Sequence, residues 1–339
     1  MSMGIIRGDT VEKQYLVINH WDKIIKDENI IIEDSQILNL LIKTEENIKD
    51  ASKKQDRLRF FYRGESEDYG ETRLTPSVFR GNNEKWGYFD ALTHFPQEFS
   101  GLSNLSKLAK MQHYTYPTRL LDLTTNPLVA LWFACSDYSR YGGASELKNK
   151  DGFFYIIAAH EDHILTHDSD KALLLACLAK LDDENEKPAL TQLLYTLAKR
   201  KNDIDNLYLT NDLVKSCKSD SSLKKGLYVF EKFIGEANRE RSAFVNYRTK
   251  VTDLLSTFII RPQIENERLR KQEGIFAIFG IQATLYDNSW CYKISRFRIP
   301  KKNKKSILME LDRLGINEAT LFGDIESRAN YNRFMKREK

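Results

Sequence analysis

Residues 111–135 read MQHYTYPTRLLDLTTNPLVALWFAC, a polar run that passes directly into a wholly apolar segment. Eight polar candidate residues lie within fifteen positions, namely Gln112, His113, Tyr114, Arg119, Asp122, Thr124, Thr125 and Asn126. Asn126 followed by Pro127 provides an N-cap and a first-turn proline, which predicts a short, buried helix over 128–135. Polar groups beside buried elements need partners. These residues therefore form either a structural network or a binding site.

A purely structural role would account for some of these eight polar residues. Arg119 and Asp122 lie three residues apart in a loop that follows a proline, and we expect them to pair and to stabilise the fold. Thr124 and Asn126 would then cap the helix, and His113 would be a hydrogen-bonded core histidine.

Upstream of this stretch, residues 57–62 predict a strand, because basic and apolar residues alternate and then give way to an apolar run before Gly64. Arg63 stands at the end of that strand. A guanidinium in this position can bind a phosphate or carboxylate with two parallel hydrogen bonds. The alternative is a salt bridge at a sheet edge.

The remaining chain alternates between strand and helix patterns. Further strands are predicted over 153–159, 256–260, 274–280 and 292–299, and helices over 35–54, 103–113 and 307–337, with a short extended segment at 320–322. Residues 169–242 have leucines at helical spacing. Because strands are spread along the chain, an α+β fold with a mixed or split sheet and a helical insertion is predicted.

These patterns give an expected division of the chain. It comprises a helical lead (1–55), the first part of the core (56–168), a helical insertion (169–250), and the second part of the core with C-terminal helices (251–339).

The composition excludes several classes of protein. The chain has 339 residues, a formal charge of +4 and a pI near 8.6, well short of a dedicated basic nucleic-acid binder. Its longest apolar runs, 128–135 and 153–159, are too short to cross a bilayer. The N-terminal sequence MSMGIIRGDTVEKQYL is not that of a signal peptide, so the cytoplasm is the expected location and no membrane contact is expected.

Common catalytic motifs are absent. The sequence lacks the P-loop, Rossmann, zinc-protease and serine-hydrolase patterns. The segment HEDHILTH places His160, His163 and His167 at helical spacing, which is conceivable as a metal site. A solvated helix start is the favoured interpretation, and no metal is expected.

Three motifs together resemble the FRG domain family, which is found mostly in bacterial proteins. They are Tyr62-Arg63-Gly64 followed by LTPSVFR at 74–80, then QHYTYPTRLLDLTTNPLVALWFA at 112–134, and the pattern N-x-R-x-x-x-Q-x-G-x-F over 266–276. The resemblance covers roughly residues 55–325. It implies no firm activity.

A more remote similarity, to toxin-like ADP-ribosyltransferases, implies a mechanism. These enzymes use an arginine that ends one strand, a Ser/Thr-rich strand with its helix, and a later strand that opens near a catalytic Glu. The resemblance implies that NAD contacts Arg63, Gly64, Tyr114, Thr124, Thr125 and Asn126. The implied catalytic residues are His113, Gln272 and Glu273. It further implies that Arg63, residues 122–126 and Gln272 share one pocket, with the strand from Gly274 beside the strand that ends at Arg63.

The third motif departs from the enzyme pattern. If Gln272 opens it, Gly274 occupies the position of the catalytic acid and Glu273 is one residue out of register, which on a strand reverses the side chain. Asp122 and Glu265 are the alternative acids. The favoured function is an enzyme that uses NAD to modify a macromolecular acceptor, protein or RNA, as a toxin or defence effector. The alternative is a nucleotide- or nucleic-acid-binding module without chemistry.

Overall fold

The computed structural model describes residues 25–26, 37–51, 57–136, 150–200, 207–208, 221–241, 250–263, 267–281 and 293–337. Glu265, one of the alternative acids, lies outside these residues. Within the described residues, no helix is both long enough and apolar enough to cross a membrane.

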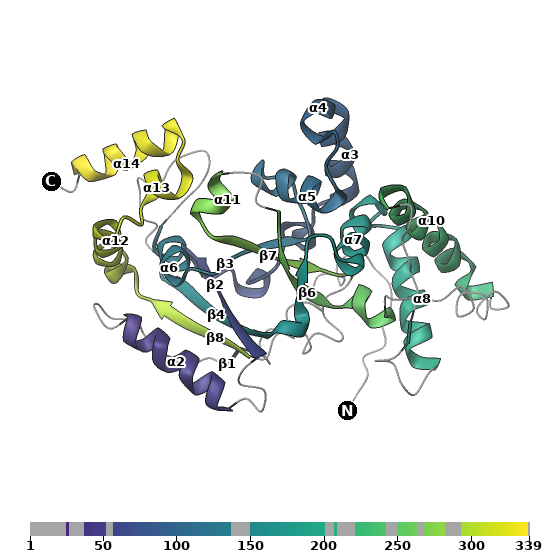
Figure 1. Ribbon diagram of the computed structural model, residues 1–339, viewed down its shortest axis with the longest axis horizontal. Coiled ribbons are helices and arrows are strands. Elements are labelled where there is room, and N and C mark those ends of the chain that lie inside the picture. The colour runs from purple at the N-terminus through teal and green to yellow at the C-terminus, as the bar shows by residue number, and fades with distance from the viewer. Residues whose placement is uncertain are drawn as a thin grey trace.

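One mixed sheet of eight strands forms the centre of the molecule (Figure 1). Its strands are β1 (Ile25–Lys26), β2 (Leu58–Glu65), β3 (Leu120–Thr124), β4 (Gly152–His160), β5 (Ile164–Thr166), β6 (Thr257–Arg261), β7 (Gly274–Phe279) and β8 (Lys293–Ile299). Their order across the sheet is β1-β8-β4-β2-β3-β7-β6-β5. The outermost pairs, β1 with β8 and β5 with β6, are parallel, and the others are antiparallel. The predicted α+β class is confirmed.

Helices surround this sheet on its edges and on one face. They are α2 (Ile37–Ala51), α3 (Glu84–His94), α4 (Pro96–Phe99), α5 (Asn104–His113), α6 (Pro127–Cys135), α7 (Asp170–Cys177), α8 (Glu186–Arg200), α10 (Lys224–Glu240), α11 (Glu267–Lys271), α12 (Lys304–Arg313), α13 (Glu318–Phe322) and α14 (Ile325–Arg337). The predicted extended segment at 320–322 is wrong, because these residues are helical. Asn317 caps that helix through its side chain, which accepts from the Thr320 amide.

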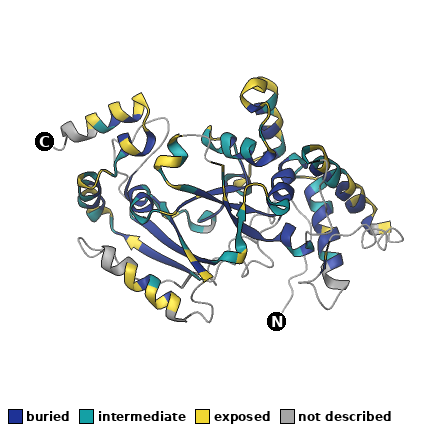
Figure 2. Ribbon diagram, in the orientation of Figure 1, coloured by how far each residue is buried: buried dark blue, intermediate teal, exposed yellow. Residues whose placement is uncertain are grey.

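Two buried clusters cover one face of the sheet. Near β2, β4 and β8, apolar side chains pack against α6 and α12. Near β3, β6 and β7, they pack against α5, α7, α8 and α10, so the helices of the expected insertion share a core with the sheet. Figure 2 shows the buried strands between helices whose outer faces are exposed.

The two halves of the sheet are joined by a single pair of residues between β2 and β3. β2 pairs with β4 along its whole length, whereas β2 and β3 meet at one position, where Tyr62 stands opposite Thr124. β3 in turn pairs with β7 from Leu120 to Thr124. Beyond the Tyr62–Thr124 pair the strands part, which leaves an opening between the two halves of the sheet.

Candidate functional site

A cavity of about 220 Å³ lies at the opening between β2 and β3. Residues from β2, β3, α5, α6, α11 and β7 line it. The polar and charged members of the lining are Arg63, Gln112, His113, Asp122, Thr124, Arg268 and Gln272. Its apolar wall includes Tyr62, Phe133, Leu269 and Phe276. We call this the inner cavity.

Arg63 reaches the inner cavity through the opening in the sheet. Its strand position, opposite Tyr155, places the side chain on the face that carries Leu121, whereas Asp122 points to the other face. The guanidinium nevertheless spans the gap, because Nη1 donates to the Asp122 carbonyl at 2.7 Å and Nε to Glu65 Oε1 at 3.1 Å. The prediction that Arg63 shares a pocket with residues 122–126 holds for Asp122 and Thr124, which line the same cavity, and not for Thr125 and Asn126.

Two further groups define the electrostatics near this opening. Burial, and the nearby guanidinium of Arg63, lower the pKa of Arg80, so two arginines share this region of the sheet. Burial also raises the pKa of Tyr62, as does the hydrogen bond that its hydroxyl donates to Glu45. Tyr62 therefore contributes a neutral aromatic wall.

Gly64 allows α6 to pack against β2 at this point. A Cβ atom there would lie 1.9 Å from the Ala130 carbonyl oxygen and 2.4 Å from the Ala134 amide nitrogen. Both are backbone atoms in α6, which cannot yield as a flexible side chain would. The glycine of the Tyr62-Arg63-Gly64 motif thus sets the distance between the strand and the helix that wall the inner cavity.

We expect Gly64→Ala to lower the free energy of unfolding by about 1 to 3 kcal/mol, because α6 must move away from β2. Urea denaturation followed by circular dichroism measures the change. Gly235→Ala in α10 is the matched control, since a Cβ there meets nothing within 4 Å and should stabilise the helix slightly. Equal stability of the two variants would contradict the prediction.

Asp122 presents its carboxylate to the inner cavity from β3. Gln112 holds it, because Gln112 Nε2 donates to Asp122 Oδ2 at 3.0 Å while Gln112 Oε1 accepts from the Thr118 hydroxyl. Among the described residues that line the cavity, Asp122 is the single acidic side chain. The predicted pairing of Asp122 with Arg119 is wrong.

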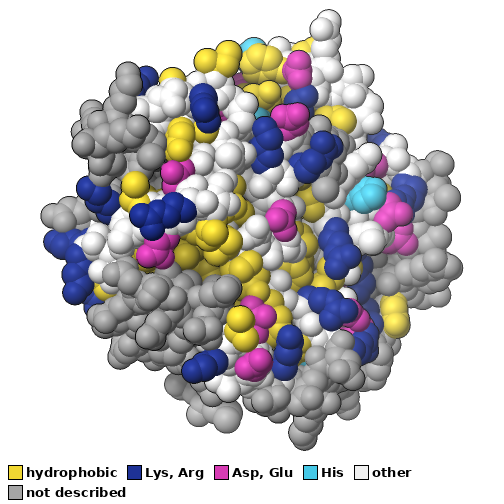
Figure 3. Space-filling model, turned by 60° about the vertical axis from the view of Figure 1, so that its left-hand side comes forward, with side chains coloured by type: hydrophobic (Ala, Val, Ile, Leu, Met, Phe, Trp, Pro, Cys, Tyr) yellow, Lys and Arg dark blue, Asp and Glu magenta, His cyan; other side chains and the backbone are white. Residues whose placement is uncertain are grey.

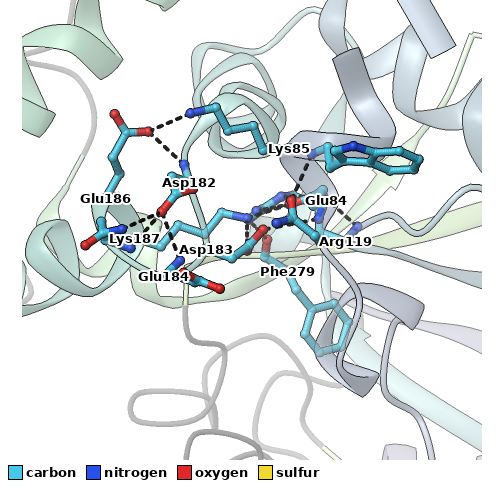
Figure 4. Close-up of polar contacts among 12 residues, drawn as sticks. Glu84, Lys85, Arg119, Asp182, Asp183, Glu184, Glu186, Lys187 and Phe279 are labelled. Carbon is cyan, nitrogen blue, oxygen red and sulfur yellow. Dashed lines mark hydrogen bonds and ion pairs between the residues drawn. The ribbon is translucent and has the colours of Figure 1, made fainter. Parts of the chain in front are cut away.

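Arg119 directly precedes β3 and belongs instead to a buried network at the start of that strand (Figure 4). Its guanidinium pairs with Glu84 of α3 and donates to the Phe279 carbonyl at 3.1 Å. Glu84 also accepts from Lys187 Nζ at 3.1 Å, and Lys187 belongs to α8. The network therefore joins the sheet to the helical segment.

The turns that follow β3 and precede β7 are tied together. The Thr124 hydroxyl donates to the Gln272 carbonyl at 2.7 Å, and the Thr125 amide donates to the Glu273 carbonyl at 3.2 Å. Asn126 caps α6, as its side chain accepts from the Leu128 amide. Thr124 lines the inner cavity, whereas Thr125 and Asn126 lie outside its lining.

Glu273 is part of this connection and lies outside the lining of the inner cavity. Its carboxylate accepts from Asn126 Nδ2 at 2.9 Å and from the Thr125 hydroxyl at 3.2 Å. The backbone at Glu273 has φ of +46°, in the left-handed region, which turns the side chain toward these partners. Gln272 does line the cavity, and its Nε2 donates to the Leu321 carbonyl at 3.3 Å.

The prediction that the strand from Gly274 lies beside the strand that carries Arg63 is wrong. The strand from Gly274 lies beside β3, and β3 separates it from β2. Gln272 still reaches the same cavity as Arg63, because the cavity extends across the end of β3.

His113 is the last residue of α5, and Tyr114 follows it as the C-cap. The two rings meet edge to face with centroids 4.9 Å apart. His113 lines the inner cavity, whereas Tyr114 lies outside it and lines a second cavity. Arg268 and Phe133, which line the inner cavity, were not among the predicted site residues, although Arg268 is a fixed position of the third motif.

The predicted helix start is present only as one short 3-10 helix, Glu161–His163, which is followed by the edge strand β5. His167 lies beyond β5, so the three histidines do not share one helix face. His163 stacks on Phe258 with centroids 5.7 Å apart. The described residues contain no group of three His, Cys, Asp or Glu side chains placed to hold a metal ion.

The surface on one side of the molecule is mixed in charge. Figure 3 shows apolar side chains exposed along a hollow across the centre, with lysine and arginine side chains on both sides of it. Aspartate and glutamate side chains lie among them on this face.

Residues 58–142 match the family model of the FRG domain. No curated protein sequence and no solved structure matches the chain. The matched segment carries β2, β3, α5 and α6, and hence Arg63, Gln112 and Asp122. Arg268 and Gln272 reach the same cavity from beyond the matched segment.

Proposed function

We propose that this chain binds a nucleotide in the inner cavity. The observation that carries the proposal is the position of Arg63, whose guanidinium spans the opening between β2 and β3 beside the cavity. A planar, permanently charged group with several donors suits a phosphate. Arg268 lines the same cavity and adds a second positive charge.

The other lining residues suit the sugar and base. Tyr62, Phe133 and Phe276 provide apolar and aromatic surface, and Gln112 and Gln272 provide amides for hydrogen bonds. Enclosed ligand sites usually measure about 300 to 1,000 Å³. The inner cavity is smaller, so it encloses one part of a nucleotide while the rest extends into the opening.

The second candidate function is transfer of ADP-ribose from NAD, and the position of Asp122 favours it. A carboxylate in the cavity can stabilise the positive charge that develops on the ribose as the bond to nicotinamide breaks. Nicotinamide leaves with the bonding electron pair. A hydroxyl, amine or water then attacks the same ribose carbon and loses its proton.

Arg63→Ala tests nucleotide binding. We expect the variant to bind nicotinamide mononucleotide about 10 to 100 times more weakly, because a hydrogen bond to a charged group contributes about 1.5 to 3 kcal/mol. Isothermal titration calorimetry measures the affinities.

Arg59→Ala is the matched control, since Arg59 is an exposed arginine of the same strand that pairs with Glu161, away from the cavity. Arg63→Lys keeps the charge without the forked donors and should give an intermediate affinity. Equal loss in the Arg59 and Arg63 variants, or no nucleotide binding by the wild-type protein, would overturn the proposal.

A further inference from the structure

A second cavity of about 280 Å³ adjoins the inner cavity. We call it the outer cavity. It lies along α5 and reaches residues 262–263, which follow β6. The two cavities share three lining residues, Ala109, His113 and Leu269. The two cavities therefore adjoin along these residues, which we call the ridge.

The lining of the outer cavity differs from that of the inner one. Its wall is largely apolar, with Leu102, Leu105 and Pro262, and it holds the ring of Tyr114, which is 56% exposed. Lys110 also lines it, but Lys110 Nζ is bound to the Glu98 carboxylate and carbonyl, so its charge is balanced. An apolar wall with an accessible aromatic ring suits a flat base.

The ridge between the cavities carries groups that suit a phosphate. His113 stands on it and faces both sides. Arg268, the neighbour of Leu269 on α11, lines the inner side, with its guanidinium 4.6 Å from the centre of the Phe322 ring. A ligand that crosses the ridge would thus place its phosphates between an imidazole and a guanidinium.

We propose that the inner and outer cavities are two subsites of one binding site, which accepts a dinucleotide in preference to a mononucleotide. The inference rests on the proposed nucleotide binding. The positively charged base, such as nicotinamide, lies in the inner subsite near Asp122. Adenosine lies in the outer subsite against Tyr114, and the pyrophosphate crosses the ridge at His113.

The test blocks the outer cavity with a bulky side chain. It then compares the affinity for NAD with the affinities for its two mononucleotide halves, nicotinamide mononucleotide and AMP. Ser106 of α5 lines the outer cavity alone, so Ser106→Trp blocks it without adding bulk to the inner one. Calorimetry is carried out with NAD, nicotinamide mononucleotide and AMP. The wild-type protein is expected to bind NAD at least about tenfold more tightly than nicotinamide mononucleotide, since stacking of one base on an aromatic ring supports such a gain.

Ser106→Trp is expected to remove that advantage and to abolish AMP binding, while the affinity for nicotinamide mononucleotide stays unchanged. Ser106→Ala, which adds no bulk, should behave as the wild-type protein. The inference is overturned if NAD binds no more tightly than nicotinamide mononucleotide, or if Ser106→Trp retains the NAD advantage. If neither half ligand nor NAD binds the wild-type protein, the proposed function fails as well. Arg63-dependent binding of the half ligand alone overturns only the two-subsite inference.

Discussion

Replacement of Glu84 with glutamine is expected to lower the free energy of unfolding by about 3 to 5 kcal/mol, because it leaves the buried Arg119 guanidinium without its anion. Arg119 is 1% exposed and Glu84 is fully buried. The Glu84 carboxylate pairs with the Arg119 guanidinium, accepts from the Arg119 amide at 2.9 Å, and accepts from Lys187. A neutral amide keeps the shape of the side chain but not the charge that Arg119 needs, whereas Lys187 keeps Asp183 as a partner.

Urea denaturation measures this loss, and Glu267→Gln is the matched control. Glu267 pairs with Lys271 at 3.3 Å, but its side chain is 77% exposed, so its replacement should cost less than about 1 kcal/mol. The double variant Glu84→Gln/Arg119→Met should lose less stability than the sum of the single variants, because it removes the unpaired cation. A loss in Glu84→Gln no larger than that in the control would refute the network as a stabilising element.

The same network predicts a difference in the pH dependence of stability. Burial alone would raise the pKa of Glu84, but the nearby Arg119 guanidinium and Lys187 ammonium outweigh it and hold the pKa below its ordinary value. Unfolding therefore takes up a proton at acid pH, and the contribution of Glu84 is lost as the pH falls through its folded-state pKa. The stability difference between wild-type protein and Glu84→Gln should accordingly shrink on acidification.

The strands that carry the core were predictable because their local pattern is strong. β4, for example, is a nearly continuous apolar run flanked by polar residues, and the structure places it inside the sheet, between β8 and β2. The edge strands β1 and β5 have two and three residues, which is too short for a periodic signal. They form because parallel partners lie beside them.

The partner of Arg119 was not predictable from local spacing. Glu84 lies 35 residues earlier in the first turn of α3, and Lys187 lies on α8. An acidic residue in the first turn of a helix is ordinarily explained by the helix dipole. Only the packing of α3 and α8 beside the start of β3 brings the three charges together.

The candidate site was predictable in position but not in the direction of its side chains. Arg63, Thr124 and Gln272 reach one cavity, as the three motifs imply. The positive φ of Glu273 turns its carboxylate to Thr125 and Asn126 instead. Left-handed backbone is unusual for a glutamate, so sequence pattern alone gives no sign of it.

If the chain transfers ADP-ribose, Asp122→Asn should reduce nicotinamide release from NAD by about a hundredfold or more while leaving nucleotide affinity nearly unchanged. Asparagine keeps an oxygen that accepts from Gln112, so the cavity keeps its shape. The variant lacks only the negative charge that stabilises the ribose cation in the transition state. Nicotinamide release during incubation with a cell extract as acceptor, followed by chromatography, gives the rate.

Glu273→Gln is the matched carboxylate-to-amide control, and it separates the two acids that the sequence left open. Its side-chain oxygen can still accept from Asn126, so the turns around it stay connected and turnover should remain within a fewfold of wild type. A hundredfold loss in Glu273→Gln with full activity in Asp122→Asn would make Glu273 the acid. That outcome would require the turn at Glu273 to open when NAD binds. Wild-type protein that binds NAD but releases no nicotinamide would instead establish the chain as a binding module, because Arg63 alone supplies affinity without a charge that acts only in the transition state.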